Sequence, residues 1–180
     1  DKDISDCIYT GILTDTGSFR FASTSSKVHR IVADLLDKGV RSDQIGKIIY
    51  ESNSFDKLKL LGYSLSKKLE IICDGRAAYI VLSRKDLLDN NYRKGDTEGI
   101  VNYALSIAGV NMATLIIETK ERVKFSFRSS GNFSVNHFAH SYFNGGGHKN
   151  AAGGSLEDKL SVALDKFLES ISKHKKELNY

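Results

Sequence analysis

The sequence lacks the features of membrane-spanning, secreted and disulfide-stabilised proteins. No run of about eighteen apolar residues is present, which excludes an apolar transmembrane helix. The first residues show neither the basic nor the apolar stretch of a secretory signal. The two cysteines, Cys7 and Cys73, stand alone in apolar surroundings, so we expect buried thiols in a reducing compartment. These absences predict a cytoplasmic protein without a membrane partner. Proline is also absent, and we have no physical account of that.

The charge balance is modest as well. The chain of 180 residues carries a formal net charge of +4, with 27% charged and 41% hydrophobic residues. Such a composition is ordinary for a globular domain. The excess of positive charge is compatible with an anionic ligand but does not by itself indicate long nucleic acid. Aromatic and basic residues alternate only at residues 19–21 (FRF), where a base-stacking surface and a core-facing Phe pair are both open interpretations.

Hydrophobic periodicity predicts a strand and then helices up to about residue 67, followed by an α/β unit. An apolar strand is expected at residues 7–13, and helices at 28–36, from Ser42 and from Ser54, with Gly39 ending the first of them. Later strands are expected at 69–73, 77–82, 112–119 and 123–128, the first two joined by an Asp-Gly hairpin turn. Later helices are expected at 85–91, from 100, at 135–143 and at 156–171, before a basic tail at 173–176 that frays.

This order suggests three parts. One strand and one helix cannot close a core, so residues 1–40 are expected to be the end of a larger domain whose first part is missing. Residues 41–67 are then a helical connector. Residues 68–180 are a self-contained α/β domain.

The densest motif is GGGHKNAAGG at residues 145–154, just before the last expected helix. Glycine lets backbone N–H groups approach a ligand closely, and a helix N-terminus carries free donors and partial positive charge. Gly145, Gly146, Gly147 and His148 therefore favour an anion site, most simply for phosphate. The alternative is a flexible linker, although linkers are more often Gly/Ser-rich or proline-rich.

Asp15 is a candidate metal ligand. It follows the expected strand at 7–13 and precedes Gly17. Metals and ligands collect at the carboxyl ends of strands in α/β sheets, and a carboxylate there suits Mg²⁺ or Mn²⁺. The alternative is a turn in which the Asp15 carboxylate accepts backbone N–H groups.

Arg128 is a candidate phosphate ligand. It ends the expected strand at 123–128, with Ser129 beside it, and one short helix separates it from the glycine-rich motif. A guanidinium can hold phosphate through two hydrogen bonds. The alternative is an exposed arginine at a strand end. His137 and His140 are spaced like a metal pair, but they lack carboxylate or cysteine partners, so we expect one of them to face solvent and the other to pack.

Together these motifs resemble a known family. TDTGSF at 14–19, SFRS at 126–129 and GGGHKNAAG at 145–153 are similar to the DHH phosphoesterases that carry a C-terminal DHH-associated domain. DTEGIVN at 96–102 also resembles their bacterial nano-RNase and pAp-phosphatase branch. The resemblance implies a mixed sheet in residues 68–180, preceded by connector helices and the last strand–helix piece of a DHH catalytic domain.

The resemblance also implies an activity. The family uses two Mn²⁺ ions to activate water for attack on phosphorus, and Asp15 matches one of their catalytic ligands. The matching substrate-binding residues are Arg128, Ser129, Gly145, Gly146, Gly147 and His148. The substrate would be a short oligoribonucleotide or pAp, the 3′,5′-bisphosphate of adenosine. One carboxylate cannot hold two metals and no Asp-His-His motif occurs, so this chain alone is expected to be inactive. A homodimer is compatible with the resemblance.

Three alternatives stay open at this point. A relative within the family would hydrolyse cyclic dinucleotides, and another hydrolase would act on polyphosphate. A third alternative is a nucleic-acid-binding module without catalysis, because a DHH-associated domain also occurs in alanyl-tRNA synthetases. Asp15 argues against that module, since binding alone needs no metal carboxylate.

Overall fold

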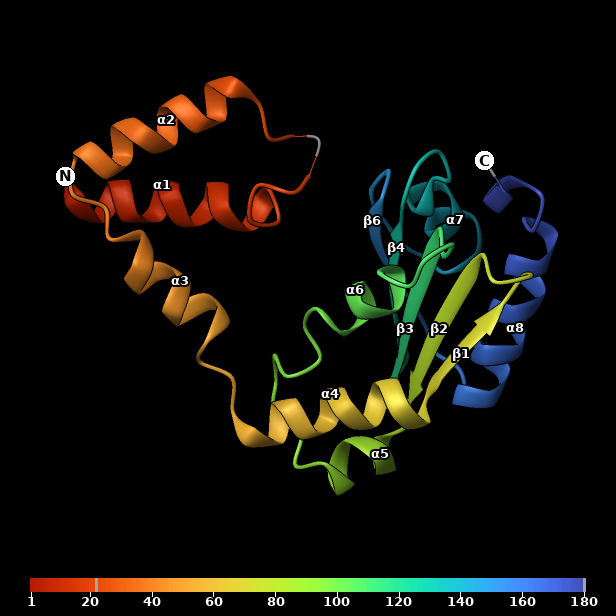
Figure 1. Cartoon of the computed structure of the whole chain (residues 1–180). Coiled ribbons are helices and arrows are strands. Elements are labelled where there is room, and N and C mark those ends of the chain that lie inside the picture. Colours follow the sequence, from red (N-terminus) through yellow and green to blue (C-terminus); the bar gives the residue numbers. More distant parts are fainter. Residues whose placement is uncertain (22, 180) are drawn as a thin grey trace. The chain divides into compact units, whose positions relative to one another are not determined.

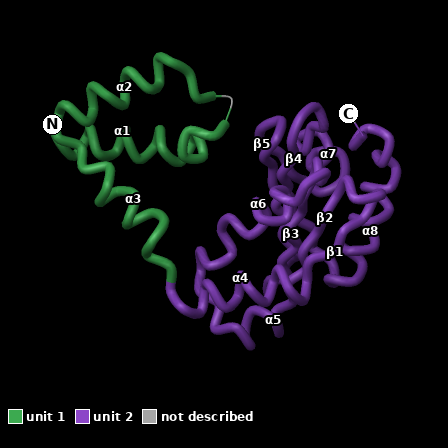
Figure 2. The backbone as a smooth tube through the Cα atoms, in the orientation of Figure 1, with its two compact units in different colours: residues 1–53 green, residues 54–180 purple. Residues whose placement is uncertain are grey.

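The structure, a computed structural model, describes residues 1–21 and 23–179 and divides into two compact units, Asp1–Asn53 and Ser54–Tyr180 (Figures 1 and 2). The division falls inside the segment expected as a connector, so its first helix belongs to one unit and its second helix to the other. In the described part of the chain, no helix combines the length and the apolar character needed to cross a bilayer.

The first unit is helical. It contains α1 (Lys2–Asp15), α2 (Ser26–Asp37) and α3 (Ser42–Tyr50). The Ser25 side chain caps α2 by accepting a hydrogen bond from a backbone N–H in its first turn. Gly39 follows the helix with a φ of +88°, as the sequence predicts. The helices enclose a small core made of Tyr9, Leu13, Val32, Leu35 and Val40.

The strand expected at residues 7–13 is wrong, because these residues lie within α1. The buried residues Ser5, Tyr9 and Leu13 recur every four positions, which is a helical spacing that the short apolar run obscured. Residues 1–40 therefore contribute two helices instead of a strand and a helix. Cys7 is exposed on α1 and Cys73 is half-buried, so the expectation of two buried thiols is also wrong.

The segment at residues 19–21 does not form an aromatic pair. Phe19 is half-buried and packs against the core of the first unit. Phe21 is 54% exposed. The core-facing interpretation therefore holds for Phe19 alone.

The second unit is built on a six-stranded sheet in the order β1-β2-β3-β4-β6-β5. The strands are β1 (Leu69–Ile72), β2 (Ala77–Leu82), β3 (Met112–Glu118), β4 (Val123–Ser129), β5 (Gly146–His148) and β6 (Ala151–Leu156). Strands β2 and β3 are parallel and the other neighbours are antiparallel, which confirms the mixed sheet. Asp74 and Gly75 form the expected hairpin turn with φ values of +55° and +84°.

Helices cover both faces of this sheet (Figure 1). They are α4 (Phe55–Lys67), α5 (Arg84–Asp89), α6 (Ile100–Leu105), α7 (Val135–Tyr142) and α8 (Leu160–Lys173). On one face, phenylalanines of β4, α7 and α8 form the larger core, which includes Phe127, Phe138 and Phe167. On the other face, α4 and α6 cover β2 and β3 through residues such as Leu60 and Ala104.

The C-terminal end differs from the sequence prediction in two ways. The last helix, α8, begins at Leu160, because residues 151–156 form β6 instead. The tail does not fray but ends in a 3₁₀ turn, Glu177–Asn179, in which Leu178 is fully buried. The Asn111 side-chain amide donates to the Leu178 carbonyl oxygen at 2.7 Å, and Lys175 pairs with Asp74 at 2.7 Å. These contacts anchor a segment whose basic composition suggested solvent exposure.

A polar cluster ties α4 to α5. The Asp86 carboxylate accepts hydrogen bonds from Lys68 (2.8 Å), the Ser83 hydroxyl (2.6 Å) and the Tyr63 hydroxyl. Ser83 and Asp86 also form a reciprocal capping box at the start of α5. Burial raises the pKa of the Asp86 carboxyl, but the hydrogen bonds outweigh burial and hold this pKa well below its ordinary value.

We predict that Asp86→Asn lowers the free energy of unfolding by about 2 kcal/mol at pH 7, because it removes a hydrogen-bonded charge from the cluster. A carboxyl whose pKa is lower in the folded state stabilises the fold above the unfolded pKa of about 4 and loses that contribution as the pH falls further. Urea unfolding at a series of pH values should therefore give a flatter acid limb for the variant.

Asp89→Asn on the same helix is the matched control. Asp89 pairs with Lys85 at the surface, so its loss should change the free energy of unfolding by at most about 0.5 kcal/mol. Equal acid limbs for wild type and Asp86→Asn would show that Asp86 does not carry this stability.

Candidate functional site

The glycine-rich motif folds as a β-hairpin, with β5 and β6 joined by a turn at Lys149 and Asn150. The expected arrangement, a loop opening directly into a helix, is therefore wrong, since α8 begins only at Leu160. The N-terminus of α8 therefore does not follow directly on the glycines in the sequence. Any anion held here must be bound by side chains and by the hairpin itself.

Most of the glycines allow backbones to pack closely. A Cβ atom at Gly145 would lie 2.0 Å from the carbonyl oxygen of Gly153, and one at Gly147 would lie 2.5 Å from that of Ala151. At both distances the added Cβ atom would collide with backbone atoms, which cannot move aside. Gly146 differs, because a Cβ there would meet only the Asn136 side-chain oxygen, at 3.4 Å. Gly145 and Gly147 thus have a structural reason to be glycine that requires no ligand.

Strand register brings Arg128 and His148 to one face of the sheet. Arg128 of β4 pairs with Ala151 of β6, and Ala151 pairs with His148 of β5. Directly paired residues of antiparallel strands point to the same face, so the three side chains form a row. Strands lie about 4.8 Å apart, which places the Arg128 and His148 Cα atoms about 10 Å from each other. Within this row, only the methyl group of Ala151 stands between the two basic side chains.

The Arg128 guanidinium is half-buried, and burial lowers its pKa while nearby Glu98 opposes that change. It stays protonated in any case, because the pKa of arginine begins far above neutral pH. One of its nitrogens donates to the Phe127 carbonyl oxygen at 2.9 Å. Within residues 1–21 and 23–179, no carboxylate oxygen lies within 4.0 Å of the guanidinium. A half-buried cation without an ion pair favours an anionic ligand.

Ser129 does not share that face. As the next residue of β4 it points into the core, where it is 6% exposed. Its hydroxyl donates to the Phe133 carbonyl oxygen at 2.7 Å and accepts from the Asn150 amide at 2.9 Å. The structure therefore separates Ser129 from Arg128, although the two are adjacent in sequence, and gives the hydroxyl a structural role.

Asp15 lies in the first unit as the last residue of α1, and its side chain is exposed. The placement at a strand end is wrong. The turn after the helix is made by Gly17, whose φ is +56°, and by the Thr16 hydroxyl, which accepts from the Phe19 N–H at 3.1 Å. These groups, and not the Asp15 carboxylate, make the turn's hydrogen bonds, so the alternative interpretation of Asp15 as a turn-forming residue is also wrong.

The position of Asp15 suits a cation. Helix C-termini carry partial negative charge, so an additional carboxylate there is unfavourable by about 0.3–1 kcal/mol unless a cation is near. In the described residues, no cluster of three or more His, Cys, Asp or Glu side chains could hold a metal ion. Any metal bound at Asp15 would therefore need its other ligands from outside the described residues.

The expectation that one of the two histidines of α7 packs is wrong. His137 and His140 are both exposed. His174, which sequence reasoning did not single out, takes part in a polar network: its ring nitrogens contact the Tyr142 hydroxyl (3.2 Å) and the Glu177 carboxylate (2.9 Å). This network packs the C-terminal turn against α7.

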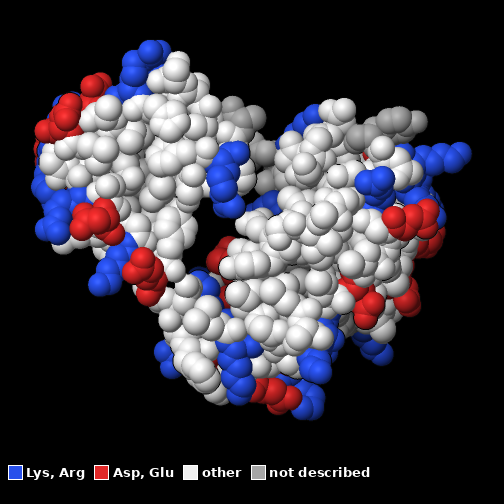
Figure 3. Space-filling model, viewed as in Figure 1, with Lys and Arg blue, Asp and Glu red and all other residues white. Residues whose placement is uncertain are grey.

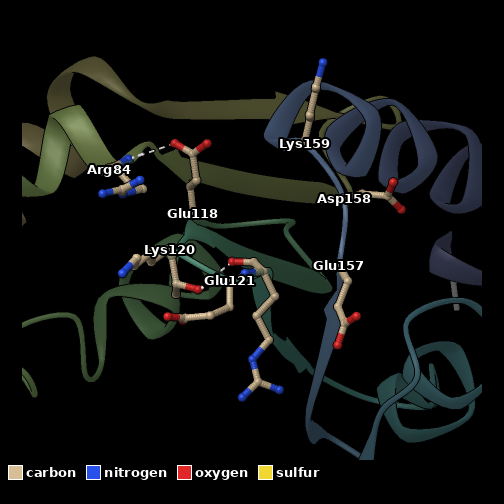
Figure 4. A pocket seen from close by; sticks show the side chains of 9 residues that line it. Arg84, Glu118, Lys120, Glu121, Glu157, Asp158 and Lys159 are labelled. Carbon is tan, nitrogen blue, oxygen red and sulfur yellow. Dashed lines mark hydrogen bonds between the residues drawn. The ribbon is translucent and has the colours of Figure 1, made fainter.

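A recess of about 440 Å³ lies at the opposite end of β4 (Figure 4). Its charged lining residues include Arg84, Lys120 and Lys159 as cations and Glu118 and Glu157 as anions. The recess takes in the β3–β4 turn, so the length of β4 separates it from Arg128, about 20 Å at 3.3 Å per residue. Its mixed charge does not select a ligand, and sequence reasoning gave no sign of it.

Comparison with known proteins identifies relatives of this arrangement. The model of the DHHA1 domain family matches residues 74–177. The bifunctional oligoribonuclease and PAP phosphatase NrnA of Thermus thermophilus is 30% identical over 171 residues, which is 94% of this chain and 50% of that protein. The Bacillus subtilis protein of the same name is 28% identical, over 84% of this chain and 47% of its own length.

One solved structure is similar over the whole chain. It is an exopolyphosphatase-related protein from Bacteroides fragilis, which is 38% identical with a TM-score of 0.94 and is covered to 53% of its length. The chain thus spans about half the length of the relatives it matches.

We predict that Gly145→Ala destabilises the second unit by about 2 kcal/mol or more, because the new Cβ must displace the backbone of β6. Gly62→Ala is the control. Gly62 lies in α4 with no atom within 4 Å of an added Cβ, so alanine there should stabilise by up to about 1 kcal/mol. Thermal unfolding followed by circular dichroism measures both, and an unchanged midpoint for Gly145→Ala would contradict the close approach.

Proposed function

Because the chain belongs to the DHHA1 domain family, as its motifs predict, we propose that it forms the substrate-binding half of a metal-dependent phosphoesterase. The substrates would be short oligoribonucleotides and pAp, the classes named for the Thermus and Bacillus relatives. Hydrolysis would require parts of the enzyme outside this sequence. The 180-residue chain alone would then bind such substrates without cleaving them.

The observation that carries this proposal is the row of Arg128, Ala151 and His148. A phosphate between the two basic side chains would receive charge-assisted hydrogen bonds from Arg128 and a hydrogen bond from a ring N–H of His148. Between them, Ala151 contributes only a methyl group. On the face that Figure 3 shows, cations and anions are interspersed and form no broad positive surface. In this proposal, affinity for an anion comes from the row.

A terminal phosphate fixed at this row would also explain a preference for short substrates. The row lies on one face of the sheet and holds one anionic group, while the net charge of +4 offers little for a long polyanion. Binding would then depend on the terminal phosphate of the substrate. Longer strands would gain few further contacts with the protein.

The metal would be Mn²⁺, held in part by Asp15. A carboxylate is a suitable ligand for this hard cation, and the exposed position at the end of α1 leaves its oxygens free. When bound, a metal pair supplies an activated water and neutralises charge on the phosphoryl oxygens. This chain would then contribute one metal ligand and the residues that bind the substrate.

Polyphosphate is a second candidate substrate, because the Bacteroides fragilis structure is named as exopolyphosphatase-related. It too offers a terminal phosphate to Arg128 and His148. A cyclic dinucleotide has no terminal phosphate and fits the row less well. A binding module without catalysis would use the row but would have no use for Asp15. Competition between pAp, tripolyphosphate and a cyclic dinucleotide for the chain separates these alternatives.

We predict that Arg128→Ala weakens binding of pAp to the chain at least about 30-fold, because a charge-assisted contact of roughly 2 kcal/mol is lost. Isothermal titration calorimetry measures the dissociation constant directly. Arg122→Ala, at the other end of β4, is the control and should leave the constant within about twofold. Unchanged affinity in Arg128→Ala would remove Arg128 from the site.

In the full-length protein, Asp15→Asn should reduce Mn²⁺-dependent hydrolysis of pAp and of a diribonucleotide by about 100-fold or more, because the neutral amide is a poor metal ligand. Affinity for pAp and the melting temperature should hardly change. Retained turnover would exclude Asp15 from the metal site. Turnover by the wild-type 180-residue chain alone, with its mass verified, would contradict the proposed division of labour.

A further inference from the structure

His148 stands on a strand that should be difficult to hold in place. Strand β5 has three residues, two of them glycine, and lies at the edge of the sheet with all three residues exposed. Glycine loses the most conformational freedom on folding, and an edge strand has a partner on one side only. The structure nevertheless fixes the hairpin from outside through two asparagines, Asn136 and Asn150.

We propose that Asn136 and Asn150 are positioning residues that fix His148 at its distance from Arg128, and so set the geometry of the phosphate site. The inference rests on the proposed function, since it concerns the same row of residues. In this inference, both asparagines influence ligand affinity indirectly, through the position of His148, and neither contacts the ligand.

Asn136 acts on the open side of β5. It lies on α7 and is half-buried, and its side-chain oxygen accepts a hydrogen bond from the Gly147 N–H at 2.8 Å. Gly147 is the residue directly before His148, so this bond holds the backbone next to the histidine against a helix of the core. Val135 and Phe138, on either side of Asn136 in α7, are buried, which makes the helix a rigid support.

Asn150 acts on the turn of the hairpin. Its amide nitrogen donates to the Ser129 hydroxyl at 2.9 Å and to the Gly131 carbonyl oxygen at 3.3 Å. Backbone bonds reinforce it: the Ser129 N–H donates to the Asn150 carbonyl oxygen at 3.1 Å, and the Val135 N–H to that of Lys149 at 2.8 Å. The turn is therefore tied to Ser129, the neighbour of Arg128 on β4.

These contacts matter because the row spans two strand spacings. Two side chains whose Cα atoms lie about 10 Å apart can share one phosphate only if both strands keep their places, and binding geometry tolerates errors of about 0.5 Å. Arg128 is on an inner strand and His148 on the edge. Movement of the edge strand alone would loosen the contact from His148 and leave that from Arg128 intact.

The first test needs no ligand. Asn136→Leu removes the acceptor at similar volume, and the amide of Gly147 should then exchange with solvent about tenfold faster in hydrogen-exchange NMR. Amides of α8 should be unaffected. His140→Leu, an exposed position on the same helix, is the matched control and should not change exchange at Gly147. Unchanged exchange in Asn136→Leu would overturn the positioning role.

The second test is a double-mutant cycle on binding of pAp, measured by calorimetry. Asn136→Leu should weaken binding about fivefold in the wild-type background, as expected for losing one hydrogen bond that holds the site. In the His148→Ala background the same substitution should change affinity by less than twofold, because there is no imidazole left to position. Asn150→Ala should show the same dependence on His148.

The outcomes separate the two proposals. A wild-type chain that fails to bind pAp or tripolyphosphate would overturn the proposed function and, with it, the role of the asparagines in affinity. A wild-type chain that binds, together with equal losses from Asn136→Leu in both backgrounds, would overturn only the positioning role. If Asn136→Leu lowered the melting temperature but its effect on affinity did not depend on His148, that result would also contradict the positioning role.

Discussion

The alternation of side chains along β4 is the constraint on which the rest of the second unit depends. Val123, Phe125 and Phe127 face the larger core, and because the strand must bury that row, Lys124, Ser126 and Arg128 are directed to the other face. A shift of one residue would bury three polar side chains and expose the phenylalanines. The same alternation separates Arg128 from Ser129, so that the arginine is available to a ligand while the serine joins the core hydrogen bonds.

The sequence was sufficient where local chemistry decides the structure. The Asp74-Gly75 turn, the end of α2 before Gly39 and the alternating strand at 123–128 are each determined by a few neighbouring residues, and each is present. It was insufficient where distant contacts decide. The apolar run at 7–13 is too short to separate strand from helix by composition, and the burial of Tyr9 and Leu13 against α2 decides for the helix.

The candidate site shows the same division. The residue types of the glycine-rich motif indicated an anion site, but not that the motif is a hairpin, because a loop before a helix and a glycine-rich hairpin share a composition. Only the pairing of Ala151 with both Arg128 and His148 creates the row. The pairing of β5 with β6 is local, but the pairing of β4 with β6 is non-local. The sequence also could not show why positions 145 and 147 must be glycine. The carbonyl oxygens that a Cβ atom would hit there come next to these positions only in the folded chain.

Glycine lets the strands of the hairpin pack closely but leaves the edge strand weakly held. The absence of side chains at positions 145 and 147 lets β5 approach β6, yet it removes the side-chain packing that normally holds an edge strand. A backbone of this kind keeps a fixed position only through hydrogen bonds from better-packed elements. Asn136 belongs to a helix whose neighbouring residues are buried, and Asn150 is bonded to the end of an inner strand. The rigidity of the core is thereby transferred to His148, which stands on the least supported strand of the sheet.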